Sequence, residues 1–144
     1  MSSGLVDVHA HFLTEHYVDA AKAAGIEQPD GMPGWPSWTL DEHLQLMDTQ
    51  NISHAILSIS SPGVHFGDDG AAVALARQVN ESAAAVVREN LARFSFFASV
   101  PLPAVEAAVD EARHAIDHLG ARGVILMSNS AGRYLGDPAL DPLW

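Results

Sequence analysis

The sequence predicts an α/β fold in which a parallel β-sheet is joined by helical crossovers. Two observations carry this prediction: four short apolar runs alternate with helix-length amphipathic segments, and Gly and Pro residues stand at the joints. Strands separated in this way run parallel and are joined by right-handed crossovers. Near-continuous apolar strands predict burial of both sheet faces, which fits an open doubly wound sheet and a (β/α)8 barrel equally well.

The first strand is predicted at Leu5–His9, and a helix follows over Thr14–Ala24 and stops at Gly25. Residues 28–37 contain three Pro and two Gly, a composition typical of irregular chain. We therefore treat residues 12–38 as a long excursion near the mouth of a site at the end of the first strand.

A capping box marks the start of the next helix. The Thr39 hydroxyl is placed to accept from the third helical N–H while Glu42 reaches back, and Leu40, Leu44 and Met47 follow on one face. The sequence therefore predicts a helix that begins directly after Thr39.

The later elements follow from the same reasoning. The stripe that defines the longest helix recurs every three or four residues and comprises Val73, Ala76, Asn80, Ala84, Val87 and Leu91. Gly120 is expected to end the helix that precedes the last strand. The predicted elements are the strand His54–Ile59, the helix 71–90, the strand Phe94–Val100, the helix Val105–Leu119 and the strand Gly123–Met127.

The last residues look like the opening of another helix, because Asp137-Pro138 and Asp141-Pro142 place Pro in a first turn. No domain boundary is expected there. We therefore expect residues 1–144 to be one domain that forms the front part of a longer protein or pairs with another chain, either a second copy of itself or a missing second half.

Charge and composition exclude several classes of function. Seven Lys+Arg against 18 Asp+Glu give a net charge of −11, whereas nucleic acids and anionic membranes are bound by clustered positive charge. No apolar run approaches the roughly 18 residues of a membrane span, and no signal peptide is recognised, so a cytoplasmic protein is expected. With no Cys in the chain, any metal site must use His and carboxylates.

The motif with the clearest chemistry ends the first strand. Strand alternation puts Asp7, His9 and His11 on one face, with Val8 and Ala10 on the other, so that two imidazoles converge. Imidazole nitrogens bind divalent metals, and a catalytic zinc site needs about three protein ligands. We predict that His9 and His11 are metal ligands and that later strands supply the rest; the plain alternative is two strand residues that meet solvent.

The other histidines are weaker candidates. His114 and His118 have the i, i+4 spacing of a helical chelate, but they are expected to face water. His43 is expected on the helix surface, and His54 at the end of the sheet opposite His11. His65 follows the second strand on the same side as His11 and is a candidate substrate contact.

Aromatic and polar residues near the predicted rim could line a substrate pocket. Phe12 and Trp38 could contact a flat substrate, although aromatic anchoring of the excursion is the simpler account. Ser60 after the second strand and Asn129 after the fourth are hydrogen-bonding candidates on the same rim. The chain has no G-x-S-x-G elbow, Walker loop or G-x-G-x-x-G, which argues against serine esterases, P-loop enzymes and Rossmann dehydrogenases.

Taken in order, these segments resemble a known family. The segments 7–13, 46–48, 55–60 with Pro62-Gly63, and 123–126 are similar to the amidohydrolase-2 family, the branch that includes aminocarboxymuconate semialdehyde decarboxylase and γ-resorcylate decarboxylase. The resemblance implies a metal-dependent (β/α)8 (TIM) barrel, here its first four β/α units, that acts as a decarboxylase or hydrolase on a small aromatic or dienic carboxylic acid.

By this resemblance, His9 and His11 take the place of the first two metal ligands. Zinc is the expected metal, with manganese as the alternative, and the remaining ligands and the catalytic residues are expected beyond Trp144. Two other functions stay open: a phosphoesterase of the PHP or TatD type, which also begins with H-x-H on a first strand, and a noncatalytic half-barrel that serves assembly.

Overall fold

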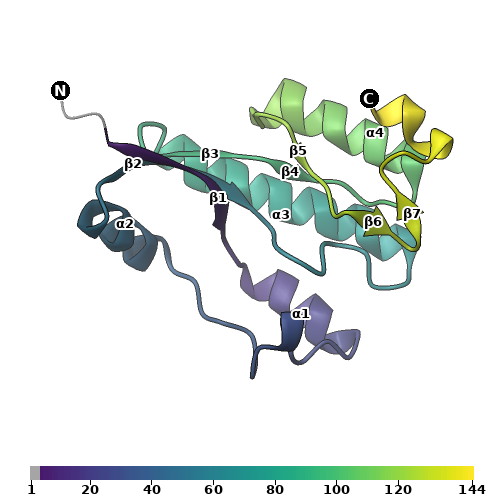
Figure 1. Ribbon diagram of the computed structural model, residues 1–144, viewed down its shortest axis with the longest axis horizontal. Coiled ribbons are helices and arrows are strands. Elements are labelled where there is room, and N and C mark those ends of the chain that lie inside the picture. Colours follow the sequence, from purple (N-terminus) through teal and green to yellow (C-terminus); the bar gives the residue numbers. More distant parts are fainter. Residues whose placement is uncertain (1–3) are drawn as a thin grey trace.

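The computed structural model describes residues 4–144 and shows a parallel α/β arrangement (Figure 1). The strands β1 (Leu5–His11), β2 (Ile52–Ser58) and β3 (Phe94–Phe96) form a parallel sheet in that order. A second parallel pair joins β4 (Ala98–Ser99) to β5 (Val124–Ile125). The predicted α/β class and the parallel direction of the strands are confirmed.

The helices cover the sheet as the crossovers require. The helix α2 packs on β2, α3 packs on β3 and β4, and α4 lies beside α3 (Figure 1). None of the described helices is both long enough and apolar enough to cross a membrane. The helical elements are α1 (Glu15–Ala23), α2 (Leu40–Thr49), α3 (Asp69–Glu89), α4 (Val105–His114), a π-helical turn at Ala115–Leu119, and 3-10 turns at Pro29–Gly31 and Pro138–Leu143.

The predicted strand Phe94–Val100 is divided into β3 and β4 because the chain changes its hydrogen-bonding partner at this point. The Phe97 N–H donates to the Leu57 carbonyl of β2 at 2.9 Å, whereas the next N–H, of Ala98, donates to the Gly123 carbonyl at 2.9 Å. The first part of the strand therefore belongs to β2 and the second part to β5. Sequence alone cannot show this change of partner.

Helix ends follow their local chemistry. The Thr39 hydroxyl accepts from the Glu42 N–H and donates to the Glu42 carboxylate at 2.7 Å, which confirms the predicted capping box. Gly120, with φ of 78°, ends the segment that follows α4, as predicted. The helix α3 begins two residues before the predicted start because the Asp68 carboxylate caps it, accepting from the Ala71 N–H at 2.7 Å.

The buried face of α3 differs in part from the predicted stripe. Val73 is 37% exposed and Leu91, beyond the helix end, is 72% exposed, so neither belongs to the core. The helix instead turns a stripe dominated by small residues toward the sheet, which permits close approach. The buried residues of α3 are Ala72, Leu75, Ala76, Val79, Asn80, Ala83 and Ala84.

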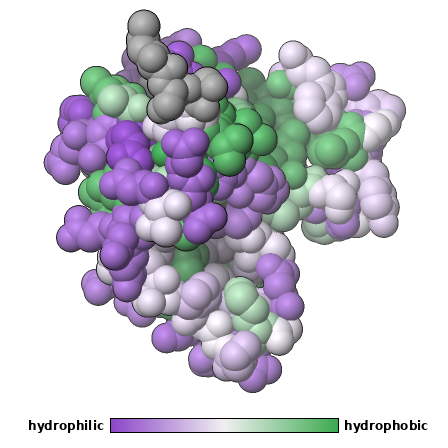
Figure 2. All heavy atoms as spheres, turned by 60° about the vertical axis from the view of Figure 1, so that its left-hand side comes forward, coloured by the Kyte–Doolittle hydropathy of each residue, from purple (hydrophilic) through white to green (hydrophobic). Residues whose placement is uncertain are grey.

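The edge strand β1 is partly open. Within residues 4–144 it pairs only with β2, and the side chains of Leu5, Val6 and Val8 are exposed. Figure 2, in which the left-hand side of Figure 1 comes forward, shows hydrophobic side chains gathered in a recess between two lobes of this face. The described residues thus leave an unpaired backbone edge beside apolar surface.

One polar network is buried between α3, α4 and β4. The Asn80 amide donates to the Ser99 carbonyl at 2.9 Å and to Glu111 at 2.8 Å, and its oxygen accepts from the Ser99 N–H at 2.8 Å. Arg77 in turn pairs with Glu111, which is only 2% exposed, at 2.8 Å. A buried carboxylate is tolerated here because it is both paired and hydrogen-bonded.

Asn80→Ala should destabilise the chain by about 1–3 kcal/mol, because it leaves the backbone groups of Ser99 and one Glu111 oxygen without their partner. Urea unfolding, followed by circular dichroism, measures the change. The control Gln78→Ala, at an exposed position of the same helix, should stay within about 0.5 kcal/mol of the parent. Equal stability of the two variants would contradict a structural role for the network.

Candidate metal and substrate site

Two imidazoles lie together at the carboxyl end of β1. The ring centroids of His9 and His11 are 4.7 Å apart, and the rings meet edge to face at 80°. His9 is exposed and His11 is half-buried, so the pair lies at the surface and not inside the core. The predicted convergence of the two rings is therefore present in the structure.

A β-bulge positions His9. Between Asp7 and Ala10 the register shifts, so that two residues of β1, Val8 and His9, lie opposite one residue of β2, Ile56. The Asp7 carboxylate accepts from the His9 N–H at 3.0 Å within this bulge. The predicted strict alternation is therefore wrong at this point: Val8 is 63% exposed, whereas Ala10, expected on the same face, is 6% exposed.

Backbone contacts orient the His11 ring. Its Nδ1 lies 3.3 Å from the Ser58 carbonyl oxygen and 3.2 Å from the Ser58 hydroxyl. Because a carbonyl can only accept, the favoured tautomer carries its proton on Nδ1, which leaves the Nε2 lone pair available. A ring nitrogen held in this way is the usual arrangement of a metal-binding histidine.

The described residues bring two imidazoles together but form no complete set of metal ligands. Within residues 4–144 no group of three His, Asp or Glu side chains is placed to hold one ion. The donor chemistry of two imidazoles fits zinc, which needs further ligands, whereas manganese would need oxygen donors beside them. His114 and His118 form a second imidazole pair with ring centroids 5.3 Å apart, on the helical segment after β4.

The aromatic residues after β1 pack inward. Phe12 is 2% exposed and lies edge to face with Trp38 at 6.0 Å, so its predicted substrate contact has no open surface in this structure. Trp38 is half-buried, and its indole N–H donates to His43 Nδ1 at 3.0 Å. Both residues anchor the excursion to the core.

Tyr17 also holds the excursion in place, through contacts with Gly63 and Trp35. Its hydroxyl donates to the Gly63 carbonyl at 2.9 Å, and its ring meets Trp35 edge to face at 5.6 Å. Burial, with a contribution from Asp30, raises the pKa of the Tyr17 hydroxyl well above its usual value. Tyr17 therefore stays a protonated donor that ties α1 to the loop after β2.

His43 is half-buried, and the prediction of a surface residue is wrong. Its ring receives the Trp38 hydrogen bond and packs edge to face on Phe94 at 5.3 Å. Burial lowers the pKa of His43, and the nearby Asp7 charge opposes part of this shift. Helix periodicity cannot show this contact, because Trp38 and Phe94 both lie outside α2.

The lowered pKa of His43 predicts a pH-dependent stability. An unfolded His takes a proton near pH 6.5, whereas the folded ring takes it only at lower pH, so the contribution is complete above about pH 6.5 and falls as the solution becomes more acidic. Urea unfolding between pH 7.5 and 5 should show this loss as a fall in the free energy of unfolding. The variant His43→Phe should show a smaller change of that free energy with pH. An unchanged slope in the variant would exclude His43 as its source.

A cleft of about 280 Å³ opens at the carboxyl ends of the later strands. Its walls come from the loop after β2, the segment after β4, and the chain that follows β5. His65 and Asn129 both line it, whereas Ser60, His9 and His11 do not. The lining residues are Ile59, Pro62 to His65, Ser99, Val100, Leu102, Pro103, Ile125 to Met127, Asn129 to Ala131, Arg133, Leu135 and Leu140.

His65 already uses both ring nitrogens. Nε2 lies 2.8 Å from an Asp69 carboxylate oxygen, and Nδ1 accepts from the Gly67 N–H at 3.3 Å. A proton on Nε2 satisfies both contacts. Neither ring nitrogen of His65 is therefore open for a substrate.

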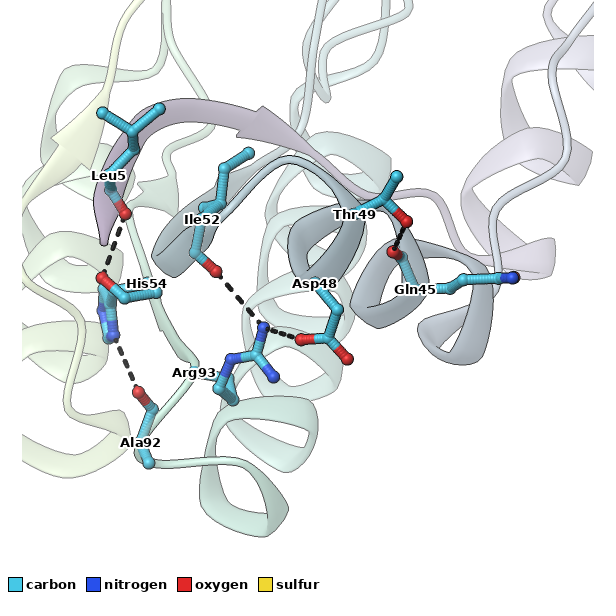
Figure 3. Close-up of polar contacts among 9 residues, drawn as sticks. Leu5, Gln45, Asp48, Thr49, Ile52, His54, Ala92 and Arg93 are labelled. Carbon is cyan, nitrogen blue, oxygen red and sulfur yellow. Dashed lines mark hydrogen bonds and ion pairs between the residues drawn. The ribbon is translucent and has the colours of Figure 1, made fainter. Parts of the chain in front are cut away.

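Structural contacts hold the opposite end of the sheet, where β2 and β3 begin. Figure 3 shows Arg93 reaching Asp48 at the end of α2, at 2.8 Å, and the Ile52 carbonyl at 3.3 Å. His54 lies at this edge, as predicted, with one ring nitrogen near the Ala92 carbonyl and the other 3.0 Å from the Ser95 hydroxyl. A second hollow of about 410 Å³ at this edge is lined by His54, Arg88, His118 and Arg122, among others.

These features define a parallel α/β chain with a histidine pair at the carboxyl edge of its sheet. A sequence profile described as "Amidohydrolase" (Amidohydro_2) matches residues 6–144. The chain belongs to this amidohydrolase-2 family, as the resemblance in the sequence predicts.

Known relatives agree with this assignment. The chain is 42% identical over 147 residues to the decarboxylase yanB of Aspergillus niger and 41% identical over 145 residues to the 6-methylsalicylic acid decarboxylase acuB of Aspergillus aculeatus, each covering 96% of this chain. These matches cover 39% and 43% of the two relatives, so the chain spans about two fifths of their length.

Solved structures show the same fold. A crystal structure described as amidohydrolase II matches with a TM-score of 0.91 at 36% identity, over 96% of this chain and 45% of that one. A dihydroxybenzoic acid decarboxylase from Polaromonas, solved with bound manganese and the inhibitor 2-nitroresorcinol, matches with a TM-score of 0.68 at 27% identity, over 84% of this chain and 37% of that one. These matches support the family's TIM-barrel fold.

Proposed function

We propose that this chain is part of a metal-dependent decarboxylase of small aromatic carboxylic acids, in which His9 and His11 are two of the metal ligands. The observation that carries the proposal is the imidazole pair at the carboxyl end of β1, with one ring oriented by the Ser58 backbone. Active sites of parallel barrels lie at this edge of the sheet.

The relatives favour decarboxylation over the other functions considered. The two Aspergillus proteins are decarboxylases, and one is named for an aromatic acid, 6-methylsalicylic acid. Neither name points to hydrolysis of a phosphate ester. The phosphoesterase and the noncatalytic assembly module therefore become the weaker alternatives.

The reaction defines what the protein must provide. Decarboxylation breaks the bond between a ring carbon and the carboxylate; the electron pair stays on the ring carbon, which takes a proton, and CO2 leaves. A bound divalent cation would supply Lewis-acid stabilisation of the negative charge that develops in the transition state. We expect zinc, or manganese as in the Polaromonas relative.

The described residues have defined parts in this proposal. His9 and His11 hold the cation through ring nitrogens, and the Ser58 carbonyl keeps the His11 proton on Nδ1. The cleft after β2, β4 and β5 accepts the ring of the substrate between its apolar walls. The further metal ligands and the group that transfers the proton are expected from residues outside 4–144.

Metal binding tests the proposal directly. His9→Ala and His11→Ala should each weaken binding of Zn²⁺ and Mn²⁺ at least tenfold, because either change removes one of the two donors. Competition with a chelator of known affinity measures the effect on the purified chain.

His114→Ala is the matched control, because it removes one imidazole from the other histidine pair. It should leave the affinity unchanged. If His114→Ala weakens binding while His9→Ala and His11→Ala do not, the metal belongs to the helical pair and the proposed site is wrong.

A further inference from the structure

Arg133 stands at the carboxyl-end cleft on a short hairpin. The strands β6 (Asn129–Ser130) and β7 (Arg133–Tyr134) are antiparallel, with Ser130 opposite Arg133. The two turn residues, Ala131 and Gly132, both have positive φ, of 51° and 81°. A tight turn of this kind fixes the direction in which the chain returns, so that β7 runs back beside β6 (Figure 1). Arg133 of β7 is one of the residues that line the cleft.

Arg133 dominates the charge of the cleft. It is the only Lys or Arg among the lining residues, and no Asp or Glu lines the cleft. Within residues 4–144 it has no ion-pair partner, whereas Arg77 and Arg93 pair with Glu111 and Asp48. In a chain of net charge −11, this guanidinium gives the cleft a local attraction for an anion.

The other walls suit a small ring. Val100, Leu102, Leu126 and Met127 are apolar, and a methionine thioether packs well against aromatic faces. Asn129 adds a neutral hydrogen-bonding side chain. A volume of about 280 Å³ lies near the lower end of small-molecule sites, which fits a ligand of one ring.

From this arrangement we propose that Arg133 binds the carboxylate of an aromatic acid in the cleft and thereby selects acids over their neutral analogues. A guanidinium can donate two parallel hydrogen bonds to one carboxylate, a geometry that an amide or an ester does not match. The inference rests on the proposed function for the class of ligand, but it does not depend on the metal, because neither His9 nor His11 lines the cleft.

Titration of the chain with 6-methylsalicylate and with 6-methylsalicylamide, in the presence of EDTA, tests the inference. Chemical-shift changes in amide NMR spectra report both the affinity and the place of binding. Arg133→Gln should weaken binding of the acid roughly tenfold and leave the amide unchanged, because one charge-assisted pair is lost. Arg133→Lys should restore part of the affinity.

Arg122→Gln is the matched control, since it removes the same charge from the second hollow, at the other end of the sheet. It should leave binding of the acid unchanged. The inference is overturned if the parent chain binds no acid at millimolar concentration, if Arg122→Gln weakens binding as much as Arg133→Gln, or if the shifted amides lie outside the cleft.

The two proposals fail separately. If metal affinity is unchanged in His9→Ala and His11→Ala, while Arg133→Gln still weakens binding of the acid, the proposed metal ligands are wrong and the carboxylate site stands. Metal binding that needs His9 and His11, with no effect of Arg133→Gln, would refute the carboxylate site alone.

Discussion

The pairing of β1 with β2 is the constraint on which the candidate site depends. This pairing contains one extra residue between Asp7 and Ala10, and the Asp7 carboxylate holds the His9 N–H inside that irregularity. Past it, Ala10 and Phe12 turn into the core, and the His11 ring meets the Ser58 backbone. A strand without the extra residue would present a different set of side chains to the core, and the two imidazoles would lose their common position.

Local signals explain which parts of the fold could be predicted. The Thr39 cap, the Gly120 helix end and the order of strands and helices depend on neighbouring residues, and the structure has them as expected. The break at Phe97 depends instead on two partners, β2 and β5, that are distant in sequence. Helical spacing predicts Asn80 as one member of the recurring stripe; only the packing of α4 against α3 shows that it bridges Ser99 and Glu111.

The same distinction applies to the site. His9 and His11 could be found from the sequence because a two-residue spacing on a strand end is a local pattern. His43 could not be placed correctly, because its burial comes from Trp38 and Phe94. No local pattern marks Arg133 as a site residue, because its place at the cleft depends on which loops meet there.

The change of partner at Phe97 has a consequence for the shape of the sheet. Along residues 94–99, the segment that pairs with β2 comes before the segment that pairs with β5. β3 pairs with β2 as far as Phe96, and β4 pairs with β5 from Ala98 onward. Such stagger tilts strands against a common axis, and it is the shear that a sheet needs to curl into a cylinder. The stagger that a closed barrel requires is therefore already present in the pairing of these strands.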